Sequence, residues 1–208
     1  MTFNQLRPAL ALTLFFVVLT GLAFPAVVWG IGRVAFPEQA AGSLLRDSQG
    51  QVIGSKLIGQ SFSKPEYFHP RPSAAGAGYD AANSSGTNLG PTSDKLVHGI
   101  ADDPTTPNVD ETYLGFEDLA DLYRKENGLP ATAVIPADAA TRSASGLDPD
   151  ISPANAALQV ARVASARGLT TERVRQLVAA HTGERWLGLL GEPRVNVLEL
   201  NLALDQAK

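Results

Sequence analysis

The sequence predicts an α+β soluble domain that is tethered by one N-terminal transmembrane helix. Three observations indicate this fold class. A long uncharged apolar run stands near the N-terminus, a hairpin pattern with a long irregular loop follows it, and amphipathic helical patterns are concentrated late in the chain. We expect a short tail over residues 1–7, the membrane helix over 8–32 and the domain over 33–208.

The predicted membrane helix is the uncharged run Pro8–Gly32, which is dominated by Leu, Val, Phe and Ala. A helix of about 20 residues crosses the hydrocarbon core of a bilayer, so this run is long enough. A cleaved signal peptide is the alternative, but its apolar stretch is only about 7–15 residues and this run continues past Pro25. We therefore favour a retained single-pass anchor in the membrane lipid. Ala26 and Gly30 have a spacing of small residues that lets a second helix pack closely, or share that spacing by chance.

Flanking charges leave the orientation of this helix nearly open. Arg7 and the terminal amine precede it, Arg33 and Arg46 follow it, and acidic residues carry little weight in the positive-inside bias. The short tail 1–7 most simply stays in the cytoplasm. We therefore expect a cytoplasmic N-terminus and an extracytoplasmic location for the bulk of the chain.

Composition excludes several classes of function. The formal net charge is −4 and no basic patch is interleaved with aromatic residues, so we expect no nucleic-acid partner. The chain has no cysteine, which excludes disulfides, thiolate metal sites and a cysteine nucleophile. His69, His98 and His181 lie far apart without ligand spacing, so we expect no metal site. The roughly 170 residues after the helix suffice for one domain with its own core.

The first part of the domain, residues 43–91, is predicted to be a hairpin followed by an irregular loop. Leu44-Leu45 and Val52-Ile53 flank a cluster of turn-forming residues, Asp47-Ser48-Gln49-Gly50. From Ser61 to Pro91 the chain is rich in Gly, Pro, Ser, Asn and Tyr and has no helical period. So long a loop in a compact domain is usually functional or disordered, and its aromatic residues argue against disorder.

Three helices are expected after this loop, over about 113–126, 153–167 and 171–182. Ser152-Pro153 is typical of a helix start, as is Thr170 before the last of the three. The segment between the first two helices is linker-like. The C-terminal segment 195–204 is ambiguous, because its leucines alternate as in a strand and also form helical i, i+4 pairs.

The segment Gly54–Ser61 nearly matches a phosphate-binding loop. Such a loop needs a lysine after its second glycine and a helix that starts there, whereas this chain has Gln60 followed by the non-helical Ser61–Pro65. We interpret the segment as a strand and a turn. Asp148 and Asp150 stand beside a predicted helix start and are expected to complement its dipole. With no Gly-x-Ser-x-Gly elbow in the sequence, we expect no catalytic residue.

Two groups of charged side chains remain, and either they face each other or each forms a solvated surface, which is the commoner case. The acidic group is Asp102, Asp103, Asp110, Glu111, Glu117 and Asp118, and the basic group is Arg162, Arg167, Arg173 and Arg175.

In order along the chain, short segments resemble one known family. They are Arg7-Pro8-Ala9-Leu10, Gly54-Ser55-x-Leu57-Ile58-Gly59-Gln60-x-Phe62, Tyr67-Phe68-x-x-Arg71-Pro72-Ser73-Ala74, Ser84-x-Gly86-x-Asn88-Leu89, Ser143–Asp148, Ile151-x-Pro153, Arg162–Arg167 and Val195–Asp205. With them the chain resembles the C subunit (KdpC) of the Kdp high-affinity potassium-transporting ATPase, found in the plasma membrane of bacteria and archaea. The match spans nearly the whole chain and fades over about 97–135.

The resemblance implies two partners, a channel-like potassium-binding subunit and a P-type ATPase subunit that hydrolyses ATP. This chain has neither the phosphorylation motif Asp-Lys-Thr-Gly-Thr nor a filter-like Thr-Val-Gly-Tyr-Gly. The resemblance therefore implies a non-catalytic accessory subunit of an ATP-driven potassium uptake pump. It would assemble or stabilise the complex and promote ATP use by the catalytic subunit. Potassium and ATP would be handled by the complex, and we expect no cofactor on this chain.

Two alternatives stay open. The family is also described as a catalytic chaperone that raises the affinity of the ATPase subunit for ATP, which would need a cytoplasm-facing domain that binds ATP together with that subunit. The residues of such a nucleotide site are unknown. The second alternative is an anchored extracytoplasmic enzyme that works alone. We favour an extracytoplasmic domain that caps the channel-like subunit.

The irregular loop is the candidate interface with these partners, because it combines aromatic anchors with polar groups, a composition enriched at interfaces. Equally, these residues could hold the loop to its own core. The candidates are Tyr67, Phe68, Arg71, Pro72, Tyr79, Asn88 and Leu89.

Overall fold

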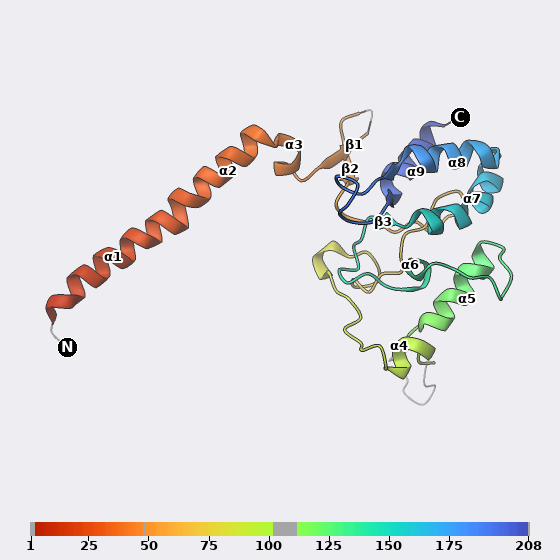
Figure 1. The fold of residues 1–208 in the computed structure, drawn as a ribbon, viewed down its shortest axis with the longest axis horizontal. Coiled ribbons are helices and arrows are strands. Elements are labelled where there is room, and N and C mark those ends of the chain that lie inside the picture. The colour runs from red at the N-terminus through yellow and green to blue at the C-terminus, as the bar shows by residue number, and fades with distance from the viewer. Residues whose placement is uncertain (1–2, 48, 102–111, 208) are drawn as a thin grey trace. The chain divides into compact units, whose positions relative to one another are not determined.

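The computed structural model describes residues 3–47, 49–101 and 112–207. They form two compact units, which divide between Ser55 and Lys56. Figure 1 traces the chain from the long N-terminal helix (red) to the C-terminal helix (blue). Helices and small antiparallel sheets occur in one chain with one apolar N-terminal helix, so the predicted α+β class is confirmed. The domain boundary at residue 33 stays a prediction.

The first unit contains a continuous helical span, Leu6–Ala35, that is long and apolar enough to cross a membrane. It consists of α1 (Leu6–Val18), a π-helical turn (Leu19–Ala23) and α2 (Phe24–Ala35). Its most apolar window has a mean hydropathy of 2.4, and no side chain of the span is buried. The π-helical turn ends two residues before Pro25, whose ring would clash with the carbonyl four residues earlier in a regular α-helix.

A short helix, α3 (Pro37–Ala40), leads into the predicted hairpin. Its strands β1 (Leu44–Arg46) and β2 (Val52–Ser55) pair antiparallel. The carboxylate of Asp47 accepts a hydrogen bond from the backbone N–H of Gln51 at 2.9 Å. Asp47 thereby holds the turn together, which is why the turn-forming cluster at this position predicts the hairpin.

In the second unit, three helices and a small sheet surround the hydrophobic core. The helices are α7 (Pro153–Arg167), α8 (Thr171–Ala180) and α9 (Val197–Gln206). The sheet has the order β3-β5-β4, with β3 (Asp150–Ile151), β5 (Arg194–Asn196) and β4 (Thr182–Gly183) all antiparallel. The larger side chains of the core are Phe68, Ile151, Val160, Val163, Val174, Val178, Val195, Val197, Leu200 and Leu204.

The ends of the long helices follow from single residues. The Ser152 hydroxyl accepts the Asn155 N–H at 3.1 Å, Pro153 occupies the first position of α7, and Gly168 ends it with φ +66°. Thr170 caps α8 in the same way, with its hydroxyl 3.2 Å from a helical N–H. The described α8 ends at Ala180, two residues before the predicted end.

The C-terminal ambiguity is resolved as a strand that turns into a helix at one residue. The side chain of Asn196 accepts the N–H of Glu199 at 3.0 Å, so β5 ends there and α9 begins. Within α9 the i, i+4 pair Leu200 and Leu204 is fully buried. Packing on one face therefore favours the helical reading of the alternating leucines.

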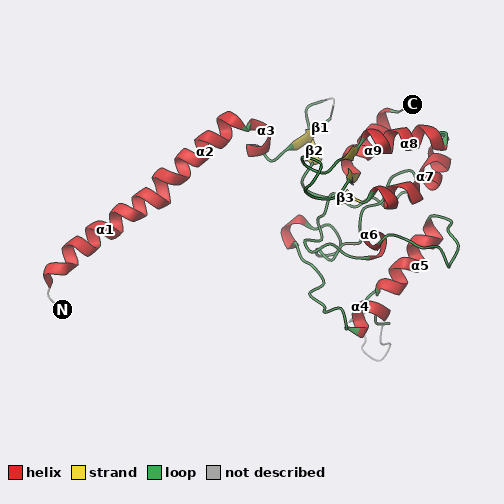
Figure 2. Cartoon of the chain, viewed as in Figure 1, coloured by secondary structure: helices red, strands yellow, loops and turns green. Residues whose placement is uncertain are grey.

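Three further α-helices and one 3-10 helix (Ala81–Asn83) lie in the remaining described part of the unit. The α-helices are α4 (Asp94–His98), α5 (Phe116–Glu126) and α6 (Ala137–Ala140). The predicted helix 113–126 begins three residues later, because Tyr113 is paired with Ile100 in a backbone bridge. Neither α4 nor α6 was predicted. Figure 2 shows how much of this unit is loop and turn (green).

Candidate functional site

The first part of the irregular loop is held by carboxamide side chains that project from two helices. Asn201 on α9 accepts the Phe68 N–H at 2.9 Å and donates to the Phe68 carbonyl at 3.0 Å. Gln159 on α7 likewise accepts the His69 N–H at 2.7 Å and donates to the His69 carbonyl at 3.0 Å. Both carboxamides are only 1% exposed. They take the place of a strand partner, because buried backbone groups must be paired.

The sequence did not predict that buried carboxamide side chains would hold the irregular loop. Gln159 and Asn155 are one turn apart on the buried face of α7, and the Gln159 amide donates to the Asn155 side chain at 2.9 Å. The Asn155 side chain in turn accepts from the Tyr123 hydroxyl at 2.8 Å. Large polar side chains on an otherwise apolar helix face are the signal that could have identified them.

Two arginines of the predicted basic group bind the same segment. Arg162 donates to the carbonyls of Pro65 and Tyr67 at 2.7 and 2.9 Å, and burial lowers the pKa of its guanidinium. Arg167 donates to the Glu66 carbonyl at 2.6 Å and lies 4.9 Å above the centre of the Tyr67 ring. These two cations therefore neither form a solvated surface nor face the acidic group.

The rest of the two charged groups behaves differently. Arg173 and Arg175 are exposed on α8. Glu117 pairs with His98 at 2.9 Å, and Asp118 accepts the Gly115 N–H at 2.9 Å. The remaining acidic residues, Asp102, Asp103, Asp110 and Glu111, lie outside the described residues.

The second part of the irregular loop lies against residues 141–148. The guanidinium of Arg71 donates to the Asp148 carboxylate at 2.8 Å, and the Tyr79 hydroxyl donates to the Arg71 carbonyl at 2.8 Å. The Ser73 hydroxyl donates to the Gly146 carbonyl at 2.7 Å. Two irregular segments thus order each other through hydrogen bonds.

Asp148 therefore does not serve the start of α7, and the expectation that it complements the helix dipole is wrong. Its carboxylate is taken by Arg71, and the Asp150 carboxylate is 3.1 Å from Arg194 Nε. Asp138 of α6 has this role instead, because it accepts both the N–H and the hydroxyl of Ser152 at 2.7 and 2.9 Å. The acid that binds the start of α7 is thus 14 positions from Ser152 in the sequence.

The phosphate-loop-like segment is a strand end and a turn, as predicted. The strand β2 ends at Ser55, a turn follows, and residues 56–80, all described, contain no helix. A Cβ on Gly59 would lie 2.5 Å from the Asp148 carbonyl oxygen and 2.6 Å from a ring carbon of Tyr79. Glycine is needed there for close packing of the two irregular segments and not for phosphate binding.

The interface candidates fall into two groups. Phe68 is completely buried in the core and has no surface to offer a partner, while Tyr67 and Arg71 bind their own domain. Pro72, Tyr79 and Leu89 are partly exposed, and Asn88 is exposed. Tyr79 and Asn88 have left-handed backbone, with φ +57° and +54°. The interface with partner subunits therefore stays a prediction, and it depends on the candidates whose side chains reach the surface.

His69 stands where the loop meets α5. Its Nδ1 lies 2.7 Å from a Glu126 carboxylate oxygen, and its Nε2 lies 2.8 Å from the Lys64 carbonyl oxygen. The hydrogen bond from His69 holds the pKa of Glu126 below its ordinary value, and Arg162 acts in the same direction. In the described residues, no group of three or more His, Cys, Asp or Glu side chains is placed to hold a metal ion.

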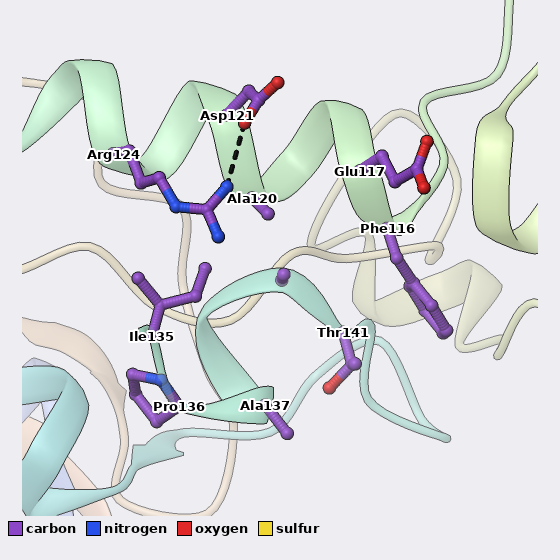
Figure 3. A pocket seen from close by; sticks show the side chains of 10 residues that line it. Phe116, Glu117, Ala120, Asp121, Arg124, Ile135, Pro136, Ala137 and Thr141 are labelled. Carbon is purple, nitrogen blue, oxygen red and sulfur yellow. Dashed lines mark hydrogen bonds and ion pairs between the residues drawn. The ribbon is translucent and has the colours of Figure 1, made fainter. Parts of the chain in front are cut away.

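Two pockets border α5. One of about 300 Å³ lies between α5 and the irregular loop and is lined in part by Arg71, Pro72 and Tyr79. The other, of about 500 Å³, lies between α5 and the segment Ile135–Thr141 (Figure 3). Figure 3 shows Arg124 reaching across toward that segment while it is paired with Asp121.

Arg124 also limits what the larger pocket can bind. Its guanidinium lies 2.8 Å from an Asp121 carboxylate oxygen, and its Nε donates to the Ala133 carbonyl at 3.0 Å. The neighbouring lining residues Ile135, Pro136 and Ala137 are apolar. The Arg124 guanidinium is already bound to Asp121 and to the backbone of the segment across the pocket. This pocket therefore does not resemble a phosphate site.

Comparison with known proteins identifies the family. The family model KdpC, described as K+-transporting ATPase, c chain, matches residues 6–206. The Potassium-transporting ATPase KdpC subunit of Mycobacterium tuberculosis (strain ATCC 25618 / H37Rv) is 52% identical over 203 residues, which cover 98% of this chain and 98% of that protein. The subunit of the same name from Caulobacter vibrioides (strain NA1000 / CB15N) is 53% identical over 202 residues, 97% of this chain and 93% of that protein. The resemblance inferred from the sequence is confirmed.

Proposed function

The chain belongs to the KdpC family of K+-transporting ATPase c chains, and from that premise we propose that it is a non-catalytic accessory subunit of a potassium uptake pump. In this proposal the Leu6–Ala35 helix anchors the chain in the membrane, with the N-terminus in the cytoplasm. The domain is extracytoplasmic, caps a channel-like potassium-binding subunit and stabilises its assembly with a P-type ATPase subunit. ATP use by the catalytic subunit is then promoted indirectly.

One observation carries this proposal, the fixed conformation of the irregular loop. Asn201 and Gln159 bind both backbone groups of two successive residues, Phe68 and His69. A long loop without regular structure is thereby given one shape. A surface that is already ordered loses little conformational entropy when a partner docks on it, and this suits a subunit whose role is to hold others in place.

The docking surface proposed for the partners consists of the loop residues Pro72, Asn88 and Leu89, of which Asn88 is exposed and the other two are partly exposed. Tyr79 is left out of this surface, because its hydroxyl donates to the Arg71 carbonyl within the domain. Asn88 is the best site for a test, because its exposed side chain sits on left-handed backbone that glycine also adopts easily. Asn88→Gly therefore removes the carboxamide without forcing the loop to rearrange. We expect Asn88→Gly combined with Leu89→Ser to reduce retention of the chain in the detergent-solubilised complex. The control is Gln176→Ala, which removes an exposed carboxamide from α8 without weakening the helix.

Deletion of the chain tests the function as a whole. We expect loss of high-affinity potassium uptake and loss of the assembled complex, measured by growth at low potassium and by co-purification of the other subunits. Restoring the full chain should restore both. Normal uptake and a complete complex in the deletion strain would exclude an assembly role.

A further inference from the structure

The connection between β4 and β5 exposes an apolar cluster that lies outside the docking surface proposed above. It consists of Trp186-Leu187-Gly188-Leu189-Leu190-Gly191, here called the apolar tip. Its four large side chains are exposed by 65% (Trp186), 74% (Leu187), 79% (Leu189) and 60% (Leu190). Contiguous apolar surface of this kind marks contact with a membrane or a partner.

The backbone of the apolar tip pairs four of its six N–H groups in a tight turn, by the bonds that follow. The Trp186 N–H donates to the Leu190 carbonyl at 2.8 Å, and the N–H groups of Leu189 and Leu190 donate to the Trp186 carbonyl at 3.1 and 3.0 Å. Gly188 N–H donates to the Arg185 carbonyl at 3.0 Å. This pairing lowers the cost of moving the tip out of bulk water, because unpaired backbone groups are costly in a nonpolar environment. The remaining backbone groups suit the interfacial region, where water and lipid headgroups are present.

The tip has a defined polar boundary. Arg185 and Glu192, the residues just outside it, form an ion pair, and every residue between them is apolar or glycine. A tryptophan therefore stands at the edge of the tip, next to charged groups. Tryptophan beside charges and leucines beyond them is the usual order of side chains across a membrane interface.

We propose that the apolar tip inserts into the interfacial region of the lipid bilayer that holds the anchor helix. Four side chains that are each 60% or more exposed leave most of the tip's surface uncovered, and mobile acyl chains can surround such a projection. A protein surface would cover one side of it. The tip then acts as a second membrane contact for the domain, beside the N-terminal helix. It rests on the membrane anchoring proposed above, since the anchor raises the effective concentration of the tip at the bilayer surface.

Spin labelling of the full chain tests this proposal, because the chain has no cysteine and each variant gains a single thiol. Leu189→Cys, Gln176→Cys on α8 and Leu14→Cys in the anchor helix are labelled with a nitroxide. Each protein is then reconstituted in vesicles of phosphatidylethanolamine and phosphatidylglycerol. We expect the Leu189 label to collide more with oxygen than with a water-soluble nickel chelate, as at Leu14, and the Gln176 label to show the reverse.

Each other outcome overturns a distinct statement. A Leu189 label that behaves like Gln176 shows a tip in water and overturns the proposal. A Leu189 label that is protected from both reagents only in the assembled complex shows a protein partner, which overturns lipid as the occupant. A Leu14 label that collides mainly with the nickel chelate overturns the anchoring, and the tip proposal with it.

A second measurement does not need a label. In a Trp29→Phe background Trp186 is the only tryptophan of the chain, and brominated phospholipid should quench its emission. Adding Leu187→Ser and Leu189→Ser should shift that emission to the red and abolish the quenching. The control Val134→Ser removes an isolated apolar side chain that is 93% exposed, and it should leave both signals unchanged. Equal signals with and without the two serines would contradict insertion of the tip.

Discussion

At the scale of single residues, carboxamides decide the shape of the irregular loop. Asn201 offers one donor and one acceptor to Phe68, and Gln159 does the same to His69. Apolar side chains of similar size cannot form such hydrogen bonds. Both side chains are buried, so water cannot replace them. The stability of the loop is therefore concentrated in a few polar contacts.

Asn201→Ala should lower the free energy of unfolding by roughly 2–4 kcal/mol, because it leaves the buried N–H and C=O of Phe68 unpaired. Chemical denaturation of the full chain in detergent measures the change. Asn83→Ala, which removes an exposed amide that bonds only Asp80 among the described contacts, is the matched control and should cost less than ~0.5 kcal/mol. Equal losses from the two variants would show that the buried amide is not special.

The His69–Glu126 contact should make stability depend on pH in the acid range. The pKa of Glu126 in the folded state lies below its ordinary value of 4.5. Its stabilisation is therefore complete above that ordinary value and is lost as the pH falls through the lower folded pKa. We expect Glu126→Gln to flatten the fall in stability on acidification, measured by denaturation from pH 6 to pH 3. Parallel curves for the variant and the original chain would exclude this contribution.

At this scale the sequence predicted local backbone conformation better than the partners of individual side chains. The glycine pattern at Gly54–Ser61 was interpreted as strand and turn because the lysine is missing. By contrast, the partners of Arg162 and Asp148 could not be found by spacing. Their contacts join residues about 80–100 positions apart, and the periodicity of a local segment carries no information on such pairs.

At the scale of elements, local signals identified the long helices. Ser152-Pro153 and Gly168 bound α7 at the predicted residues. The strand-or-helix choice at 195–204 depends on which face is buried, so only packing could settle it. The helices α4 and α6 are four or five residues long, too short for an apolar period to appear.

Helix capping gives the prediction at this scale. Ser152→Ala should cost about 1–2 kcal/mol, because the hydroxyl both caps α7 and donates to Asp138. Thr170→Ala removes a cap with a single bond on the exposed start of α8 and should cost about 1 kcal/mol or less. Thermal unfolding of both variants, followed by circular dichroism, compares them. A larger effect at Thr170 would contradict the role of Asp138 as second partner.

At the scale of the whole molecule, the sequence predicted the fold class of the chain and its family. Both depend on features that can be read directly from the sequence, namely the length of the apolar run and the order of the short motifs. The side of the membrane on which the domain lies is harder, because Arg7 and Arg33 flank the helix almost symmetrically. That side also separates the two candidate roles. An extracytoplasmic domain can cap a channel, whereas a direct ATP-binding role needs the cytoplasm.

A reporter fused after Lys208 measures that side. We expect alkaline phosphatase, which is active only outside the cytoplasm, to be active in the fusion, and a green fluorescent protein that folds only inside to be dark. A fusion after residue 5 with the same two reporters is the control and should show the opposite pattern. The residue-5 fusion precedes the membrane helix and is the cytoplasmic reference. An inactive phosphatase and a bright fluorescent protein after Lys208, as in that reference, would favour the cytoplasm-facing chaperone.

The amide contacts to Phe68 and His69 also limit how this loop can change in length. Surface loops usually accept insertions and deletions, because their ends are the only fixed points. Here Asn201 and Gln159 fix two neighbouring residues from two different helices, and Arg162 and Arg167 fix the residues just before them. One residue added or removed between Glu66 and Arg71 would shift the backbone groups of this segment away from the amide and guanidinium groups that bind them. Variation in length should therefore be tolerated at the Asp47–Gln51 turn and excluded from this segment.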